Sequence, residues 1–143
     1  MHLMIKYEDL KIIATTRLQE AKALHGNNLF DGAAYLCGYV VETSLKARIC
    51  KCLNIESYPD DGEHKNIFST HNFDRLLIFS GLQKEISAAG IPELFANWSL
   101  LTSWKPERRY IPIGTYSKEE VEALFKALED NPHGFLTWIC TKW

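Results

Sequence analysis

The sequence has little glycine and proline and lacks any long hydrophobic run. Eight glycines and five prolines in 143 residues exclude collagen-like and low-complexity disordered chains and favour helices. The longest apolar run, residues 32–41, has ten residues, about half of the ~20 needed to cross a bilayer, so neither a transmembrane helix nor a membrane partner is expected. The acidic residues Glu8 and Asp9 appear before the apolar region of a signal peptide could form. A cytoplasmic protein is therefore expected.

The chain also lacks a charge excess. Sixteen Lys and Arg stand against 18 Asp and Glu, a formal net charge of −2. This balance excludes a protein that attracts nucleic acid through the electrostatic field of a large positive net charge. It is compatible with a local basic patch.

Several motifs that carry chemistry are absent. There is no G-x-x-x-x-G-K-[ST], no G-x-G-x-x-G and no G-x-S-x-G, which excludes the common phosphate-binding loops and the nucleophile elbow. The four cysteines show no repeated C-x-x-C spacing and are expected to be reduced, mostly buried thiols. Cys50 and Cys52 point apart on one predicted helix, because successive positions turn by about 100°, so no metal site is expected and no cofactor is implied.

Helical periodicity runs through most of the chain. It predicts an all-α fold in one domain covering residues 1–143, an up-and-down bundle of four to five helices with a short C-terminal helix. The second helix is apolar nearly all round in its first half and should be central. The predicted helices cover residues 7–24, 29–53, 70–81, 82–89, 92–105, 117–128 and a short segment from Pro132, with a polar loop at 54–70.

Two local features sharpen this prediction. Ser117 followed by Glu120 is a capping box, which marks the start of a helix. Ala34 and Gly38 lie four residues apart on one helix face, where their small size allows a neighbouring helix to approach closely.

Glu42 and Lys46 form the first candidate for chemistry. They stand at i and i+4 in the favourable order, directly after the apolar stretch. A carboxylate near the interior of a bundle needs a cationic partner or several donors, so the pair is either part of a site or a plain surface ion pair.

A cationic loop is the second candidate. Lys105, Arg108 and Arg109 lie within five residues between Trp104 and Tyr110. Guanidinium groups bind phosphate bidentately and aromatic rings stack on bases, so this loop is interpreted as an anion clamp for a nucleotide or RNA. The alternative is a solvated charge run in which one Arg neutralises a buried carboxylate.

His71 stands at a predicted helix start beside the polar loop. There it could contact an anion or act as an acid or base, or it could simply cap or pack against the helix.

Three segments in order resemble the HEPN (higher eukaryotes and prokaryotes nucleotide-binding) superfamily. Residues 32–49 resemble its second-helix pattern a-a-y-L-x-G-y-x-x-E-x-x-L-K-A, which is fairly specific. Residues 70–77 look like its H-x-L/F-x-x-L-L helix start, and residues 104–110 look like its W-x-P-E-x-R-Y segment. With the helices between them, the similarity spans about residues 5 to 130.

The resemblance implies an all-α bundle that is often a homodimer. Its members include RNA-cleaving toxins, partners of minimal nucleotidyltransferases in toxin–antitoxin-type pairs, and non-catalytic binders of nucleotides or RNA. At the positions that match the family pattern, the resemblance implies that a set of polar residues forms a surface for a ligand or a partner: Glu42, Lys46, His71, Arg109 and Tyr110.

The ribonuclease members carry an Arg and a polar residue followed a few positions later by a His on one helix. Here no His follows Arg109 within that distance, and Pro112 and Gly114 break any helix. A non-catalytic binding protein is therefore expected, with no assigned catalytic residues. The alternatives are a metal-independent ribonuclease that uses His71 and Arg109, and a protein-interaction module in which the charged residues are structural.

Overall fold

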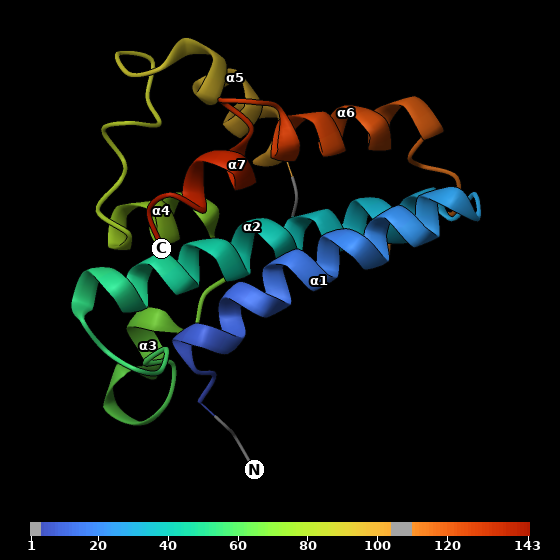
Figure 1. Ribbon diagram of the computed structural model, residues 1–143. Helices are drawn as coiled ribbons and strands as arrows, with labels where there is room; N and C mark the ends of the chain where they lie inside the picture. Colours follow the sequence, from blue (N-terminus) through green and yellow to red (C-terminus); the bar gives the residue numbers. More distant parts are fainter. Residues whose placement is uncertain (1–3, 104–109) are drawn as a thin grey trace.

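The computed structural model describes residues 4–103 and 110–143, and this part of the chain is helical (Figure 1). The all-α prediction is confirmed, because the described residues form seven α-helices and no strand. Within these described ranges, one isolated antiparallel bridge joins Lys6 to Ser57. The helices are α1 (Tyr7–Gly26), α2 (Phe30–Leu53), α3 (Lys65–Phe68), α4 (Phe73–Phe79), α5 (Pro92–Leu101), α6 (Lys118–Glu129) and α7 (Phe135–Ile139), with a 3-10 turn at Gly62–His64.

Helices α1 and α2 form a long antiparallel hairpin (Figure 1). Asn28 adopts the left-handed conformation (φ 60°) in the tight turn between them, and Asn54 does the same (φ 54°) where α2 ends. The buried residues of α1 follow helical spacing: Leu10, Ala14, Leu18 and Ala21.

Helix α2 is the central element of the molecule. It contacts α1 on one side and α4, α6 and α7 on the other, so most of its length is buried (Figure 1). This burial agrees with the sequence of its first half, which is apolar nearly all round.

Aromatic side chains fill the core between the shorter helices. The ring of Trp98 on α5 lies 6.2 Å from that of Phe73 on α4 and 5.5 Å from that of Phe135 on α7, measured between centroids. Rings at such separations interact favourably in addition to burying area. This chain of rings joins α4, α5 and α7 into one layer over α2.

Helix α6 begins as the sequence predicts. The Ser117 hydroxyl accepts a hydrogen bond from the Glu120 amide at 3.1 Å, and the Glu120 carboxylate accepts one from the Ser117 amide at 3.3 Å. Both halves of the capping box are therefore present.

Three local predictions need correction. The loop at 54–70 contains two short helical pieces and the buried side chain of Tyr58. Residues 82–89 form turns instead of a helix. The last helix begins at Phe135 and not at Pro132, because the Gly134 amide donates to the Asp130 carbonyl at 2.7 Å and closes a turn first.

The segment before α6 is tied to α2 by one carboxylate. Asp31 accepts a hydrogen bond from the Gly114 amide at 2.7 Å with one oxygen and from the Tyr116 amide at 2.9 Å with the other. This arrangement seats residues 114–116 on the first turn of α2.

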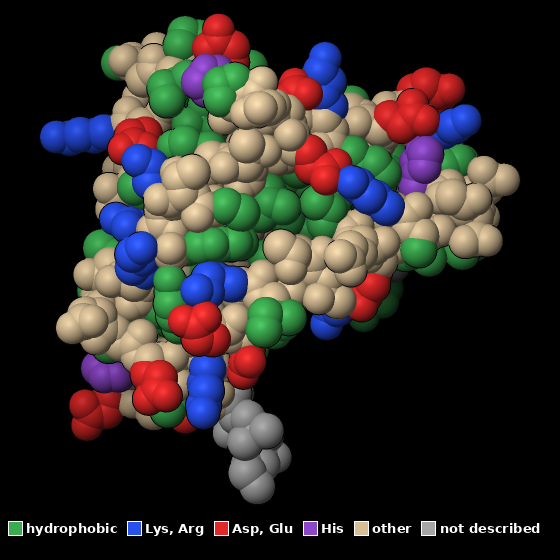
Figure 2. All heavy atoms as spheres, viewed as in Figure 1, with side chains coloured by type: hydrophobic (Ala, Val, Ile, Leu, Met, Phe, Trp, Pro, Cys, Tyr) green, Lys and Arg blue, Asp and Glu red, His purple; other side chains and the backbone are tan. Residues whose placement is uncertain are grey.

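On the face shown in Figure 2, charged side chains of both signs are interspersed, and hydrophobic side chains gather between the α1–α2 hairpin and the layer of α6 and α7. None of the helices described is both long and apolar enough to cross a membrane.

Candidate functional site

The candidate site is centred on Glu42, a buried carboxylate in the middle of α2. Only 4% of the residue is exposed. Burial of an ionised carboxylate is costly unless opposite charges or hydrogen-bond donors compensate it. Its two oxygens have different partners: Oε1 contacts Nδ1 of His71, and Oε2 lies 3.5 Å from Nζ of Lys46.

His71 is held in place by the start of α4. It precedes Asn72, whose side chain caps the helix by accepting from the Arg75 amide at 2.9 Å. The Asn72 amide in turn donates to the Thr70 hydroxyl at 3.1 Å. The backbone on both sides of His71 is thus fixed, and its side chain remains 53% exposed.

The contact with Glu42 determines how the His71 ring can act. A carboxylate accepts the hydrogen from Nδ1, which leaves Nε2 as the atom that can accept a proton or, when the ring is protonated, donate to an anion. The same relationship orients catalytic and metal-binding histidines in many proteins.

Lys46 is the second partner of this carboxylate, and an aromatic ring lies against its ammonium group. Its Nζ lies 4.9 Å from the centroid of the Tyr58 ring, and 12% of its side chain is exposed. The Tyr58 hydroxyl donates to the Phe68 carbonyl at 2.7 Å, and burial raises the pKa of this phenol well above its usual value. Tyr58 therefore remains neutral and places its ring against the ammonium group.

Two further tyrosines lie on the same face of α2. The hydroxyls of Tyr35 and Tyr39 are 2.9 Å apart, and their rings meet edge to face with centroids separated by 5.2 Å. Both side chains are partly buried.

The predicted site residues fall into two groups. The structure brings together Glu42, Lys46 and His71, whereas Lys105, Arg108 and Arg109 lie outside the described residues. Tyr110 follows that segment and is 78% exposed.

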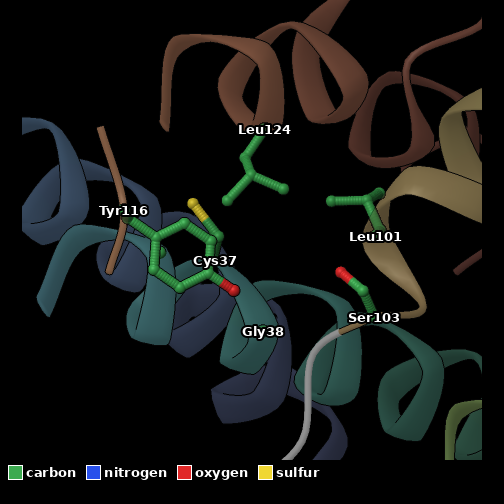
Figure 3. A pocket seen from close by; sticks show the side chains of 7 residues that line it. Cys37, Gly38, Leu101, Ser103, Tyr116 and Leu124 are labelled. Atoms are coloured by element: carbon green, nitrogen blue, oxygen red, sulfur yellow. The ribbon is translucent and has the colours of Figure 1, made fainter. Parts of the chain in front are cut away.

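The chain enters the cationic segment next to the site. Ser103 lines a cavity of about 10 Å³ together with Gly38, which is one helical turn before Glu42 (Figure 3). Ala34 and Leu124 line the same cavity, so the small residues of α2 face the end of α5 and one side of α6. This volume holds at most one water molecule.

The sequence analysis missed three tyrosines as site residues. Tyr35, Tyr39, Glu42 and Lys46 are spaced four, three and four residues apart, and this helical spacing could have revealed the first two. Tyr58 carries no such signal, because it reaches Lys46 from an irregular segment.

The buried thiols are poor nucleophiles. Burial raises the pKa of the Cys37 thiol to about 12 and that of Cys50 to about 11, so both stay protonated near neutral pH. The structure assembles no group of three or more potential metal ligands among the residues it describes.

No protein-family model, curated protein or solved structure matches this chain, so the resemblance to HEPN proteins rests on the three sequence segments that carry it.

Proposed function

We propose that this protein binds the phosphate groups of a nucleotide or RNA where Lys46 of α2 and His71, at the start of α4, meet at Glu42. The observation that supports this proposal is the arrangement around Glu42, whose buried carboxylate orients a half-exposed imidazole beside an ammonium group. A surface ion pair needs no such burial.

The charge of this cluster defines what else binding requires. Glu42 and Lys46 cancel each other, so the described part of the cluster carries a positive charge only when His71 is protonated. A stable phosphate site therefore needs further cations. Lys105, Arg108 and Arg109 supply them in this proposal, with Tyr110 as an adjacent stacking ring, because the chain enters their segment beside Gly38.

Binding of AMP and of a 12-nucleotide single-stranded RNA tests the proposal. Arg109→Lys keeps the charge but loses the bidentate geometry, and Arg109→Ala loses both, so affinity should fall in two steps. His71→Gln should also weaken binding. The matched controls are Arg17→Ala, which removes an exposed Arg on α1 paired with Glu20, and His133→Gln.

The contrary outcome is equal affinity of the unaltered protein and Arg109→Ala at low salt, where phosphate contacts are strongest. If Arg109→Ala instead lowers stability and Glu42→Gln restores it, Arg109 neutralises the buried carboxylate and the cluster is structural. That result would favour the interaction-module alternative.

A metal-independent ribonuclease is the second candidate, and the contact between Glu42 and His71 favours it. A carboxylate-oriented imidazole can act as a general base on a ribose hydroxyl. Cleavage of labelled RNA in excess chelator, abolished by His71→Ala, would support this activity over simple binding.

A partner protein is part of the proposal on the strength of the HEPN resemblance. The partner is a minimal nucleotidyltransferase in a toxin–antitoxin-type pair in the cytoplasm. Co-purification of this chain with the product of an adjacent nucleotidyltransferase gene tests this association.

A homodimer is also proposed, and exposed apolar residues at one end of the hairpin support it. Leu29 is 55% and Ile113 100% exposed, and both line an open pocket of about 330 Å³ with Phe30 and Tyr116. In a two-fold dimer the same patch meets itself, so the exposed Ile113 of each copy can enter the pocket of the other copy.

A further inference from the structure

Arg48 lies on α2, six positions after Glu42, and its guanidinium group binds two backbone carbonyls. Nε donates to the carbonyl of Ser80 at 3.1 Å, and Nη1 donates to that of Lys142 at 2.9 Å. Carbonyls at helix ends lack partners within the helix, and Ser80 is the residue that ends α4. Because a planar guanidinium directs donors to two places at once, Arg48 ties both α4 and the C-terminal turn (residues 140–142) to one point of α2.

Further hydrogen bonds fix both partners of this guanidinium. Ser80 is fully buried, and its hydroxyl donates to the Leu77 carbonyl at 2.6 Å and accepts from the Leu82 amide at 3.3 Å. On the other side, Lys51 donates to the backbone oxygen of Trp143, directly after the C-terminal turn, at 3.1 Å. A guanidinium held by this turn is preorganised to bind the carbonyl at the end of α4.

Two polar contacts therefore join α4 to α2, one at each end of α4. His71, which precedes the capping residue, contacts Glu42, and Ser80, which follows the helix, binds Arg48. The two positions on α2 are six residues apart, as are the first and last residues of α4, so each interval is about 9 Å along its helix. The spacing of the contacts on α2 thus matches the length of α4.

The apolar contacts of α4 do not replace these two polar contacts. Phe73, Leu76 and Leu77 are buried and hold the helix in the core. Burial of apolar area is non-directional, so it resists the removal of α4 from the core more than a small shift or rotation of the helix. Such a shift matters at His71, because a hydrogen bond weakens steeply when its geometry departs from the optimum.

We propose that Arg48 is a positioning residue for the phosphate site, because it holds the far end of α4 and thereby keeps the His71 ring on Glu42. This inference rests on the proposed function and deepens it, since it names a residue that sets the geometry of the site from about 9 Å along α2. Loss of Arg48 frees one end of α4, and the ring then loses its fixed hydrogen bond to the buried carboxylate.

Nitrogen NMR of the histidine rings tests the positioning role directly, with His71→Gln to assign the signals. In the unaltered protein the neutral His71 ring carries its hydrogen on Nδ1, which the Glu42 carboxylate accepts. Arg48→Met keeps a long unbranched side chain and removes the donors, so the His71 signals should move toward those of a free imidazole, in which both tautomers are present. Arg48→Lys keeps the charge but loses the planar fork, and its shift should be intermediate.

A matched control separates position from stability. Leu18→Ala removes part of a buried side chain on α1 and should lower the urea midpoint, while the His71 ring signals keep their positions. If the urea midpoint of Arg48→Met falls and its His71 signals stay in place, Arg48 is only structural and the proposal is wrong. If Arg48→Met does not fold, Arg48→Lys decides between the same two outcomes.

AMP affinity, measured by calorimetry, tests the link to the phosphate site. Arg48→Met should weaken binding about tenfold, the scale of one lost charge-assisted hydrogen bond. In the His71→Gln background the same change should have no further effect, because Arg48 acts through the ring. Equal losses in both backgrounds would overturn the proposal. If the unaltered protein binds neither AMP nor RNA, the proposed function is wrong, and the ring signals alone decide whether Arg48 positions His71.

Discussion

Nδ1 of His71 contacts Oε1 of Glu42 across 29 residues of sequence, at the point where α4 begins beside α2. The contact joins a buried charge to a half-exposed ring. It also joins the two helices that carry the candidate site, so stability and binding should both depend on it.

Glu42→Ala should lower the free energy of unfolding by about 2–3 kcal/mol, because it leaves the largely buried Lys46 without its carboxylate. Glu42→Gln should cost less, since the amide oxygen still accepts a hydrogen bond. Urea unfolding measures both. The matched control is Glu129→Ala, which breaks an exposed ion pair with Lys22 (2.7 Å) and should cost at most about 1 kcal/mol. Equal costs for the two Ala variants would contradict this account.

Gly38→Leu should destabilise the protein by about 1–3 kcal/mol, because the cavity beside Gly38 is only about 10 Å³ and cannot accept a branched side chain. The control is Gly26→Leu, since an added Cβ at Gly26 meets nothing within 4 Å. Similar urea midpoints for the two variants would show that the α2 face around Gly38 is not tightly packed.

Ionisation of the buried thiols Cys37 and Cys50 should lower the free energy of unfolding in alkaline solution. Their pKa values are raised in the folded state, so the thiols ionise first in the unfolded chain and their stabilising effect is lost as pH rises above about 9. For Cys37 the loss continues to about pH 12, with a limiting slope of about 1.4 kcal/mol per pH unit.

The measurement is urea unfolding under reducing conditions at pH 8 and pH 10. Cys37→Ala should have the shallower pH dependence of stability, whatever its stability at pH 8. Cys52→Ala is the control, because Cys52 is exposed. A Cys37→Ala slope equal to that of the unaltered protein would refute the prediction.

Asp31→Ala should release the segment before α6, because one carboxylate holds the amides of both Gly114 and Tyr116. Hydrogen exchange at these two amides should become faster, while the amides in the middle of α6 keep their protection. Ser117→Ala is the comparison, since it loosens the first turn of α6 through the cap alone. Unchanged exchange at Gly114 would contradict the anchoring role.

Ile113→Asp combined with Leu29→Asp should abolish the proposed homodimer, because charges on a two-fold patch are buried twice. Light scattering over a range of concentrations gives the mass. Ile12→Asp, at a 62% exposed position on α1, is the control. A concentration-independent monomer mass for the unaltered protein would sink the dimer itself.

Most of the fold could be predicted because long periodic segments carry their own signal. Helices α1, α2, α5 and α6 follow apolar spacing, and the capping box at Ser117 marks a boundary. Segment 82–89 could not be predicted in this way. The spacing of Leu82 and Ile86 imitates a helix, but both side chains are buried from a segment of turns and bends.

The site was only partly predictable for a related reason. The pairing of Glu42 with Lys46 is local and follows from helix geometry. The contacts of Glu42 with His71 and of Lys46 with Tyr58 depend on how separate segments pack, and no periodicity encodes them.

One rigid helix holds two points of the chain that lie eleven residues apart in the sequence. Ser103 lies beside Gly38 and Gly114 is bound to Asp31, two positions about 10 Å apart along α2. The distance between these two attachment points is therefore set by the rise of α2. Any sequence placed between Ser103 and Gly114 has to span that distance, and a substitution at Asp31 can release one end of the segment while the contact at Gly38 stays in place.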